Sequence, residues 1–256
     1  MPVSVIPGAE AWSVDGDGAG AVVVHGFTGT PATMRPVADA LAEAGFAVSV
    51  PRLPGHGTTV DDMQSTRFGD WYSAVEAAWR ELSSSCERSV AVGLSMGGTL
   101  ICRLAARHPE LAGVACINPL VEPAEPELKE LVRLMLDAGE TVAPGIGSDV
   151  TDPSVREITY DASPLAPALS LYEALDDLQI DLGRIACPVL VMTSTDDRVV
   201  HPHNSEHLAA AVTGPVERVT LARSSHVATI DVERDDVAAR VVAFTARVTG
   251  RTAPGS

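Results

Sequence analysis

The chain has 256 residues, which suits one large α/β domain with a buried core. Its 34 acidic and 18 basic residues give a formal charge of −16, which argues against nucleic-acid binding and against docking to an anionic membrane surface. The four cysteines are scattered along the chain. The N-terminus shows no secretory signal, and no apolar run is long enough for membrane insertion. Together these features predict a cytoplasmic protein with free thiols.

Short apolar segments rich in β-branched residues alternate with helical patterns along the chain. They predict strands at residues 21–25, 46–50, 90–92, 113–117, 189–192 and 216–221. Several are almost entirely apolar, which is typical of strands covered on both faces in a parallel sheet. The alternation predicts an α/β fold with a mostly parallel, doubly wound sheet.

Three helices with recognisable ends are predicted among these strands. Thr30 is expected to cap the first, with Pro31 at its first helical position. Asp70 is expected to cap the second, over residues 71–82, and the third covers residues 235–248.

Residues 119–182 interrupt the alternation, because no strand is predicted there. Two amphipathic segments each place apolar side chains on one face: Leu128, Leu131, Val132 and Met135 in the first, and Ala168, Leu171, Tyr172 and Leu175 in the second. The stretch also holds 14 acidic and three basic residues, a balance of −11. Helical insertions in α/β cores commonly form lids. Residues 119–182 are therefore predicted to be a helical cap, and residues 1–118 and 183–256 the core.

The sequence Gly93-Leu94-Ser95-Met96-Gly97 lies between a predicted strand and a helical pattern. A sharp reversal there places Ser95 in a strained backbone conformation, and the two glycines relieve the crowding. The hydroxyl then stands at the tip of the turn, beside the start of a helix. This context predicts a nucleophilic serine, which needs a base and an orienting carboxylate.

In hydrolases with this turn, the acid and then the base follow the serine along the chain. His226 fits the base, because it follows the last predicted strand by a short loop. The loop after the preceding strand offers two acids, Asp196 and Asp197. Asp197 is favoured because the residues that follow it match the hydrolase pattern: one variable residue, two small apolar residues and, two positions later, a proline. Asp196 remains the alternative.

Acyl transfer also needs two donors for the oxyanion. The backbone N–H of Met96, directly after Ser95, is one candidate, and the N–H of Phe27 in the loop after the first predicted strand is the other. His25 is expected to support that loop by hydrogen bonding.

Five motifs carry a resemblance to a known family: HGFTGTP at residues 25–31, PRLPGHGT at 51–58, GLSMGGT at 93–99, GSDV at 147–150 and SHVATID at 225–231. The chain resembles the α/β-hydrolase superfamily, and within it the bacterial monoacylglycerol lipases and related carboxylesterases. The resemblance covers residues 20–245. It implies a triad of Ser95, Asp197 and His226, an oxyanion hole at Phe27 and Met96, and a lid that shapes an acyl tunnel.

The resemblance also implies that Glu157 of the cap binds the glycerol head group; the alternative is an ordinary solvent-facing glutamate. The expected activity is hydrolysis of monoacylglycerols, small lipid-like esters, through an acyl-enzyme, with no metal or cofactor. A general carboxylesterase for short acyl esters is one alternative. A ligand-binding protein with a weakly active triad is another.

Overall fold

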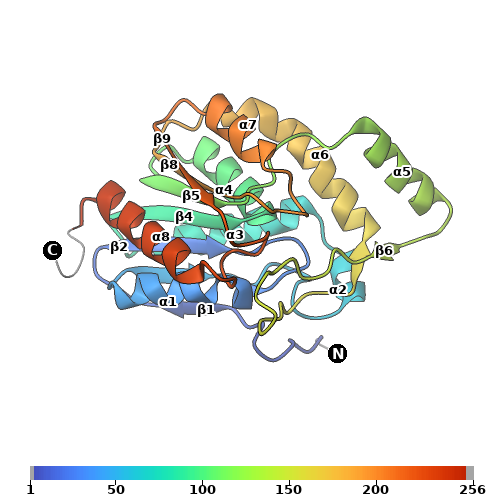
Figure 1. Cartoon of the computed structure of the whole chain (residues 1–256), viewed down its shortest axis with the longest axis horizontal. Coiled ribbons are helices and arrows are strands. Elements are labelled where there is room, and N and C mark those ends of the chain that lie inside the picture. Colours follow the sequence, from blue (N-terminus) through green and yellow to red (C-terminus); the bar gives the residue numbers. More distant parts are fainter. Residues whose placement is uncertain (1–2, 252–256) are drawn as a thin grey trace.

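The computed structural model describes residues 3–251, which form one α/β domain around a seven-stranded sheet (Figure 1). The strands are β1 (Trp12–Val14), β2 (Ala19–Val24), β3 (Ala47–Val50), β4 (Arg88–Leu94), β5 (Gly113–Ile117), β8 (Val189–Ser194) and β9 (Val216–Leu221). Their order is β1-β3-β2-β4-β5-β8-β9, and every neighbouring pair is parallel except β1 with β3. The six predicted strands are confirmed as the parallel ones; β1, short and largely exposed, was not predicted.

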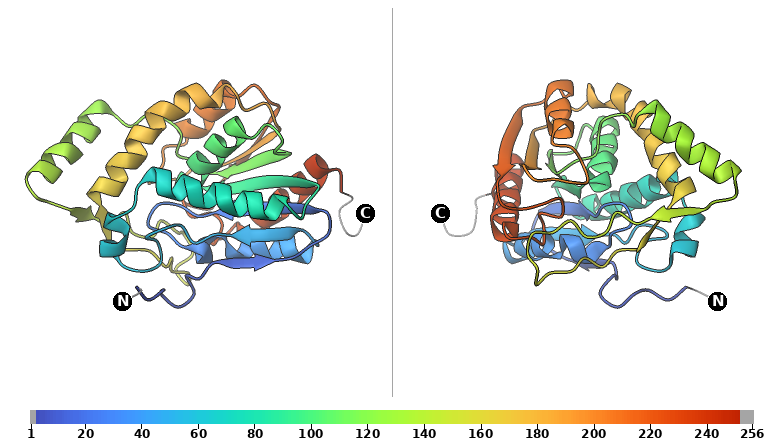
Figure 2. Two further views of the ribbon diagram at one scale, coloured as in Figure 1. Left: turned by 180° about the vertical axis from the view of Figure 1, so that it is seen from behind. Right: turned by 45° about the vertical axis from the view of Figure 1, so that its right-hand side comes forward.

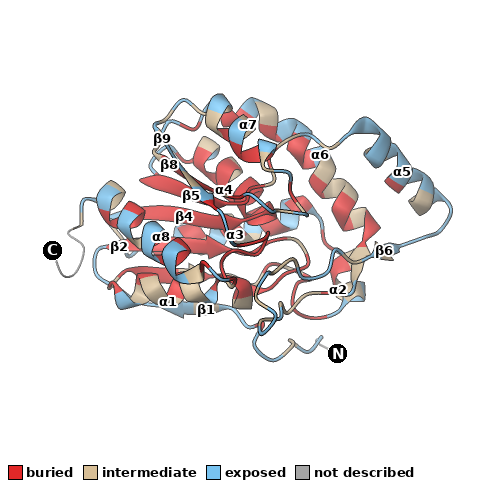
Figure 3. Ribbon diagram, viewed as in Figure 1, coloured by how far each residue is buried: buried red, intermediate tan, exposed pale blue. Residues whose placement is uncertain are grey.

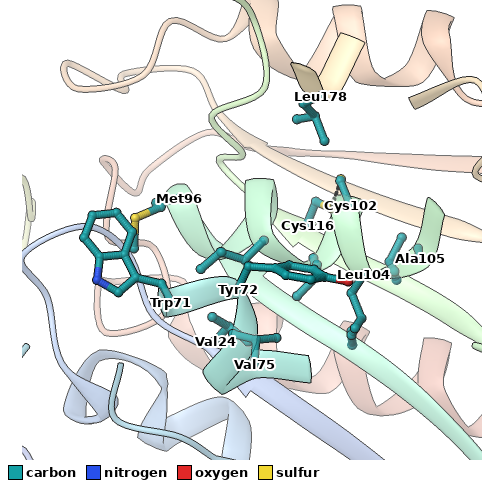
Figure 4. Close-up of a cluster of buried hydrophobic side chains, with 14 of the residues drawn as sticks. Val24, Trp71, Tyr72, Val75, Met96, Cys102, Leu104, Ala105, Cys116 and Leu178 are labelled. Carbon is teal, nitrogen blue, oxygen red and sulfur yellow. Dashed lines mark hydrogen bonds between the residues drawn. The ribbon is translucent and has the colours of Figure 1, made fainter. Parts of the chain in front are cut away.

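Helices cover both faces of the sheet, as the apolar strands predicted. The helices outside residues 118–188 are η1 (Pro31–Met34), α1 (Arg35–Glu43), α2 (Val60–Gln64), α3 (Phe68–Ser83), α4 (Met96–Arg107), α7 (His203–Ala211) and α8 (Arg234–Thr249). α1 and α8 pack in one apolar cluster, and α3 and α4 in another on the opposite face. Alternate residues of β2 divide between the two, since Val22 and Val24 belong to the α3–α4 cluster and Val23 to the other. Figure 4 shows part of the α3–α4 cluster.

Two of the predicted helix ends differ from the structure. Thr30 does precede a helix, but that helix is the short 3-10 turn η1, and the Thr30 side chain makes no capping hydrogen bond. The second helix begins at Phe68, so Asp70 lies inside its first turn. The Asp70 carboxylate accepts a hydrogen bond from the N–H of Arg67 at 2.8 Å and thus still stabilises the helix start.

The chain between β5 and β8, residues 118–188, leaves the sheet and is called the β5–β8 connection here. It contains α5 (Pro126–Asp137), β6 (Val142–Pro144), β7 (Ala162–Pro164) and α6 (Leu165–Leu182). The expectation that this stretch holds no strand was wrong, because β6 and β7 form a small antiparallel sheet. The two predicted amphipathic segments lie in α5 and α6.

The two helices of the connection differ in how far they are buried. α6 packs against α3 and α4 of the core, whereas α5 packs on α6 at the periphery (Figures 1 and 2). Lys129 of α5 pairs with Asp176 of α6 at 2.7 Å, and Arg133 pairs with Glu173 at 2.9 Å. Most of α5 is exposed, as Figure 3 shows. No helix within residues 3–251 is long and apolar enough to cross a membrane.

Candidate active site

Ser95 occupies the turn between β4 and α4 with φ 55° and ψ −120°, a region that L-residues rarely adopt. The flanking glycines permit this conformation. A Cβ on Gly93 would lie 2.4 Å from the carbonyl oxygen of Gly97, and one on Gly97 would lie 2.3 Å from that of Val24. The predicted strand, strained serine and helix are therefore all present.

Backbone hydrogen bonds hold this turn in place. The N–H of Ser95 donates to the carbonyl of Ile117 at the end of β5, at 3.0 Å. The Ser95 carbonyl accepts from Gly98 at 2.8 Å and from Leu120 at 3.2 Å. Because the turn is tied to the next strand as well as to its own helix, the serine is positioned by the sheet itself.

His226 and Asp197 come together from neighbouring loops at the carboxyl ends of β9 and β8. Nδ1 of His226 lies 2.7 Å from Oδ2 of Asp197, and both side chains are buried. A carboxylate only accepts hydrogen bonds, so Nδ1 carries the proton; in the neutral ring Nε2 is then the nitrogen with a free lone pair. The other Asp197 oxygen accepts from the N–H groups of Val199 and Val200, at 2.9 and 2.8 Å.

Asp196, the alternative acid, lies in a different environment. Its side chain is 63% exposed and pairs with Arg198, which is itself 67% exposed. Asp196 therefore faces solvent, while Asp197 faces the histidine.

The two predicted oxyanion donors come from two different elements, the start of α4 and the loop after β2. Met96 is the first residue of α4, where an N–H has no acceptor within the helix. Phe27 belongs to the loop after β2, which approaches the serine closely because Gly26 has no side chain: a Cβ there would lie 3.3 Å from Cβ of Ser95. Within residues 3–251, neither the Phe27 nor the Met96 N–H donates to another protein group.

His25 supports this loop, as expected. Its Nδ1 lies 2.9 Å from the carbonyl of Gly26, and its Nε2 accepts from the N–H of Leu53 at 3.3 Å. Complete burial lowers the pKa of His25 to about 4. The ring is therefore neutral near pH 7 and links two loops.

Two cavities meet at Ser95 and Phe27. The larger has a volume of about 640 Å³ and runs between α5, α6 and the core. Its wall is mainly apolar and includes Leu128, Leu131, Val132, Met135, Leu171, Tyr172 and Leu175. The smaller, of about 40 Å³, is lined by Ser95 and His226 together with Thr28, Asp149 and Glu157.

Glu157 is half-buried and borders the smaller cavity, rather than facing open solvent. Burial raises the pKa of its carboxyl from 4.5 to about 7. Oε1 would lie 3.1 Å from a Cβ on Gly29, so the glycine makes room for the carboxyl beside the Phe27 loop. A carboxyl that lines the same small cavity as the serine is suited to binding polar hydroxyl groups of a ligand.

Two residues that contact the loops of the candidate site were not found from the sequence. Asn118, directly after β5, has φ 43°, and its side-chain amide donates to the carbonyl of His226 at 2.7 Å. Asp149, in the β5–β8 connection, accepts from the N–H of His226 at 3.1 Å. The only sequence signal for Asp149 was its place in the GSDV motif, and that motif carried no structural role.

The fold and the strained serine turn define an α/β-hydrolase. The family model described as serine aminopeptidase, S33 matches residues 18–233. A thermostable monoacylglycerol lipase from Bacillus sp. (strain H-257) is 37% identical over 249 residues, 96% of this chain and 98% of that relative. A carboxylesterase from Bacillus subtilis (strain 168) is 25% identical over 228 residues, 87% and 90% of the two chains. The chain belongs to the serine aminopeptidase S33 family of α/β-hydrolases.

Solved structures show the same relationship. A structure from work on the metagenome-derived lipolytic enzymes LipS and LipT is 36% identical, with a TM-score of 0.91 over 95% of this chain and 100% of that one. The monoacylglycerol lipase of Paleococcus ferrophilus has a TM-score of 0.77 at 17% identity, covering 97% of this chain and 100% of that one. The second likeness, at this low identity, is one of fold.

Proposed function

We propose that the protein is a serine ester hydrolase that cleaves monoacylglycerols into glycerol and a fatty acid. The observation that carries this proposal is the buried His226–Asp197 pair, whose histidine lines the same small cavity as the strained Ser95. The 37% identity to a monoacylglycerol lipase over nearly the whole chain supports the choice of substrate.

In the proposed mechanism, Nε2 of His226 takes the proton of the Ser95 hydroxyl as Oγ attacks the ester carbonyl. Asp197 orients the ring and stabilises the imidazolium that forms. The N–H groups of Phe27 and Met96 donate to the oxyanion, a contribution of about 2.7–4 kcal/mol for each such donor. His226 then protonates the departing glycerol oxygen. A water, deprotonated by the same nitrogen, attacks the acyl-enzyme and releases the fatty acid.

The two cavities support separate places for the two halves of the substrate. The apolar cavity of about 640 Å³ takes the acyl chain, and the small cavity takes the glycerol. Glu157 accepts hydrogen bonds from glycerol hydroxyls there. Residues 119–182 act as the cap, because α5 and α6 form much of the acyl-chain wall. The core then comprises residues 1–118 and 183–256, and the ends of that range lie outside the described residues.

A cytoplasmic location is part of the proposal. All four cysteines are free thiols, and no disulfide joins Cys102 to Cys116, whose sulfur atoms lie 3.8 Å apart, within hydrogen-bonding distance. Reduced, adjacent thiols are typical of proteins in a reducing compartment.

Labelling with a fluorophosphonate, with Ser95→Ala as the control, tests the enzyme class. The native protein should carry one adduct on Ser95 and the variant none; a folded native protein without the adduct would contradict the proposal and favour a ligand-binding role. Rates on 1-monododecanoylglycerol, p-nitrophenyl acetate and a long-chain triacylglycerol then test the substrate. We expect the highest kcat/KM on the monoacylglycerol, whereas a preference for the acetate would identify a short-acyl carboxylesterase.

A further inference from the structure

One carboxylate of the β5–β8 connection bridges the two loops that carry the acid and the base. Oδ2 of Asp149 accepts from the N–H of His226 at 3.1 Å and from the N–H of Arg198 at 3.2 Å. Arg198 directly follows Asp197 in the chain. A single oxygen atom therefore links the backbone of His226 to the backbone beside its acid partner.

The Asp149 side chain is well placed for this bridge, being only 10% exposed. Its backbone carbonyl also accepts from the N–H of Val227 at 3.1 Å, so Asp149 holds two successive residues of the histidine loop. By contrast, its ionic contact with Arg198 is long, at 3.7 Å, and the guanidinium is largely in solvent. The hydrogen bonds to backbone, and not the ion pair, carry the contact.

The following residues of the connection are fastened to the same loop by a second carboxylate. Asp231 accepts from the N–H groups of Thr151, Asp152 and Ser225, at 2.8–2.9 Å. Burial alone would raise the pKa of Asp231, but these backbone donors lower it, which keeps the carboxylate ionised and accepting. The hydroxyl groups of Thr151 and Ser225 also lie 2.8 Å apart. Asp149 is therefore held in a fixed position relative to His226.

We propose that Asp149 is a positioning residue for the Asp197–His226 pair, so that the pair is aligned only while residues 149–152 are docked on the histidine loop. This inference rests on the proposed function of that pair. Without the Asp149 side-chain oxygen, the N–H groups of His226 and Arg198 lose their shared acceptor, and the loops of β8 and β9 lose one of the links that hold them together. Misplacing a reacting group by about 1 Å costs roughly 100-fold in rate.

Steady-state kinetics of Asp149→Ala and Asp149→Asn on p-nitrophenyl butyrate provide the first test. An asparagine keeps a carbonyl oxygen that accepts from both N–H groups, whereas an alanine does not. We expect Asp149→Ala to lower kcat by about 10- to 100-fold with KM within about threefold, and Asp149→Asn to restore kcat to within about threefold. The control is Asp137→Ala, at an exposed aspartate of the same connection that lies at the end of α5, outside residues 149–152.

The second test needs no turnover and is informative even if the alanine variant is unstable. The proton between His226 Nδ1 and Asp197 gives a far-downfield NMR resonance, which should persist in Asp149→Asn and in Ser95→Ala but weaken or vanish in Asp149→Ala or Asp149→Ser. Unchanged kcat and resonance in the alanine variant would overturn the proposal, as would equal losses in the alanine and asparagine variants. A native protein that shows the resonance but cleaves no ester would instead contradict the proposed function.

Discussion

Replacing Glu157 by glutamine should stabilise the protein at neutral and alkaline pH while weakening recognition of glycerol. Burial beside the small cavity raises the pKa of this carboxyl from 4.5 to about 7. At pH values between these two pKa values, the Glu157 carboxyl keeps its proton in the folded protein and releases it in the unfolded chain. Stability therefore falls as the pH rises through this window, because the folded state binds the proton more tightly.

The size of the effect follows from the pKa change. Each pKa unit corresponds to about 1.4 kcal/mol, so the rise from 4.5 to about 7 means a penalty of ~3 kcal/mol once the pH exceeds 7. Glutamine has nearly the same shape and never ionises. The Glu157→Gln variant should match the native protein below pH 4.5 and exceed its unfolding free energy by up to ~3 kcal/mol above pH 7.

Urea unfolding of the native and variant proteins at pH values from 4 to 8 measures this difference directly. Other titrating groups are common to both proteins and cancel in the comparison. Glu140→Gln, at an exposed glutamate of the same connection, is the control and should leave the difference near zero at every pH. A Glu157→Gln variant that is less stable than the native protein at pH 8, or a difference that does not change with pH, would refute the argument. In kinetics, KM should rise for monoacylglycerol but not for p-nitrophenyl butyrate.

Four further substitutions test the site. Asp197→Asn should lower kcat by about 10⁴-fold, because the amide favours the wrong histidine tautomer; Asp196→Asn should change it less than about threefold, and the reverse order would identify Asp196 as the acid. Val132→Trp should fill part of the apolar cavity and lower kcat/KM for hexadecanoyl relative to butanoyl esters by roughly 5- to 150-fold, the equivalent of about 1–3 kcal/mol of overpacking. An unchanged ratio would place the acyl chain elsewhere. Gly97→Ala should reduce both Tm and kcat, since its Cβ would lie 2.3 Å from the Val24 carbonyl oxygen, and a variant with native Tm and activity would contradict this.

The parts of the fold that were predicted correctly are those encoded by local pattern. The inner parallel strands β2, β4 and β5 were recognisable because burial on both faces makes most of their residues apolar. The turn at Ser95 was recognisable because a backbone forced to φ 55° requires glycine at neighbouring positions, and Gly93 and Gly97 are both present. Local chemistry alone sufficed at these places.

The features that were missed depend on contacts between distant residues. β6 and β7 are three residues each and both end in proline, so neither shows a strand pattern, and only their pairing with one another defines them. Asp149 accepts a hydrogen bond from the N–H of His226, which lies 77 residues further along the chain. No sequence spacing reveals such a contact, because the number of residues between Asp149 and His226 does not determine whether the two residues meet in the fold.

The missed contacts tie the β5–β8 connection to the loops of the candidate site. Residues 146–157 contribute Ile146 and Glu157 to the wall of the small cavity, and between them Asp149 accepts hydrogen bonds from the N–H groups of Arg198 and His226. On the proposed function, the segment that contacts the glycerol is thus also the segment that aligns His226 with Asp197. When glycerol binds, its contacts would order this segment and thereby favour the aligned Asp197–His226 pair. Part of the binding energy of the glycerol group would then raise kcat, and would not only lower KM. An ester lacking the glycerol hydroxyl groups would forgo that contribution, even if its acyl chain filled the apolar cavity equally well.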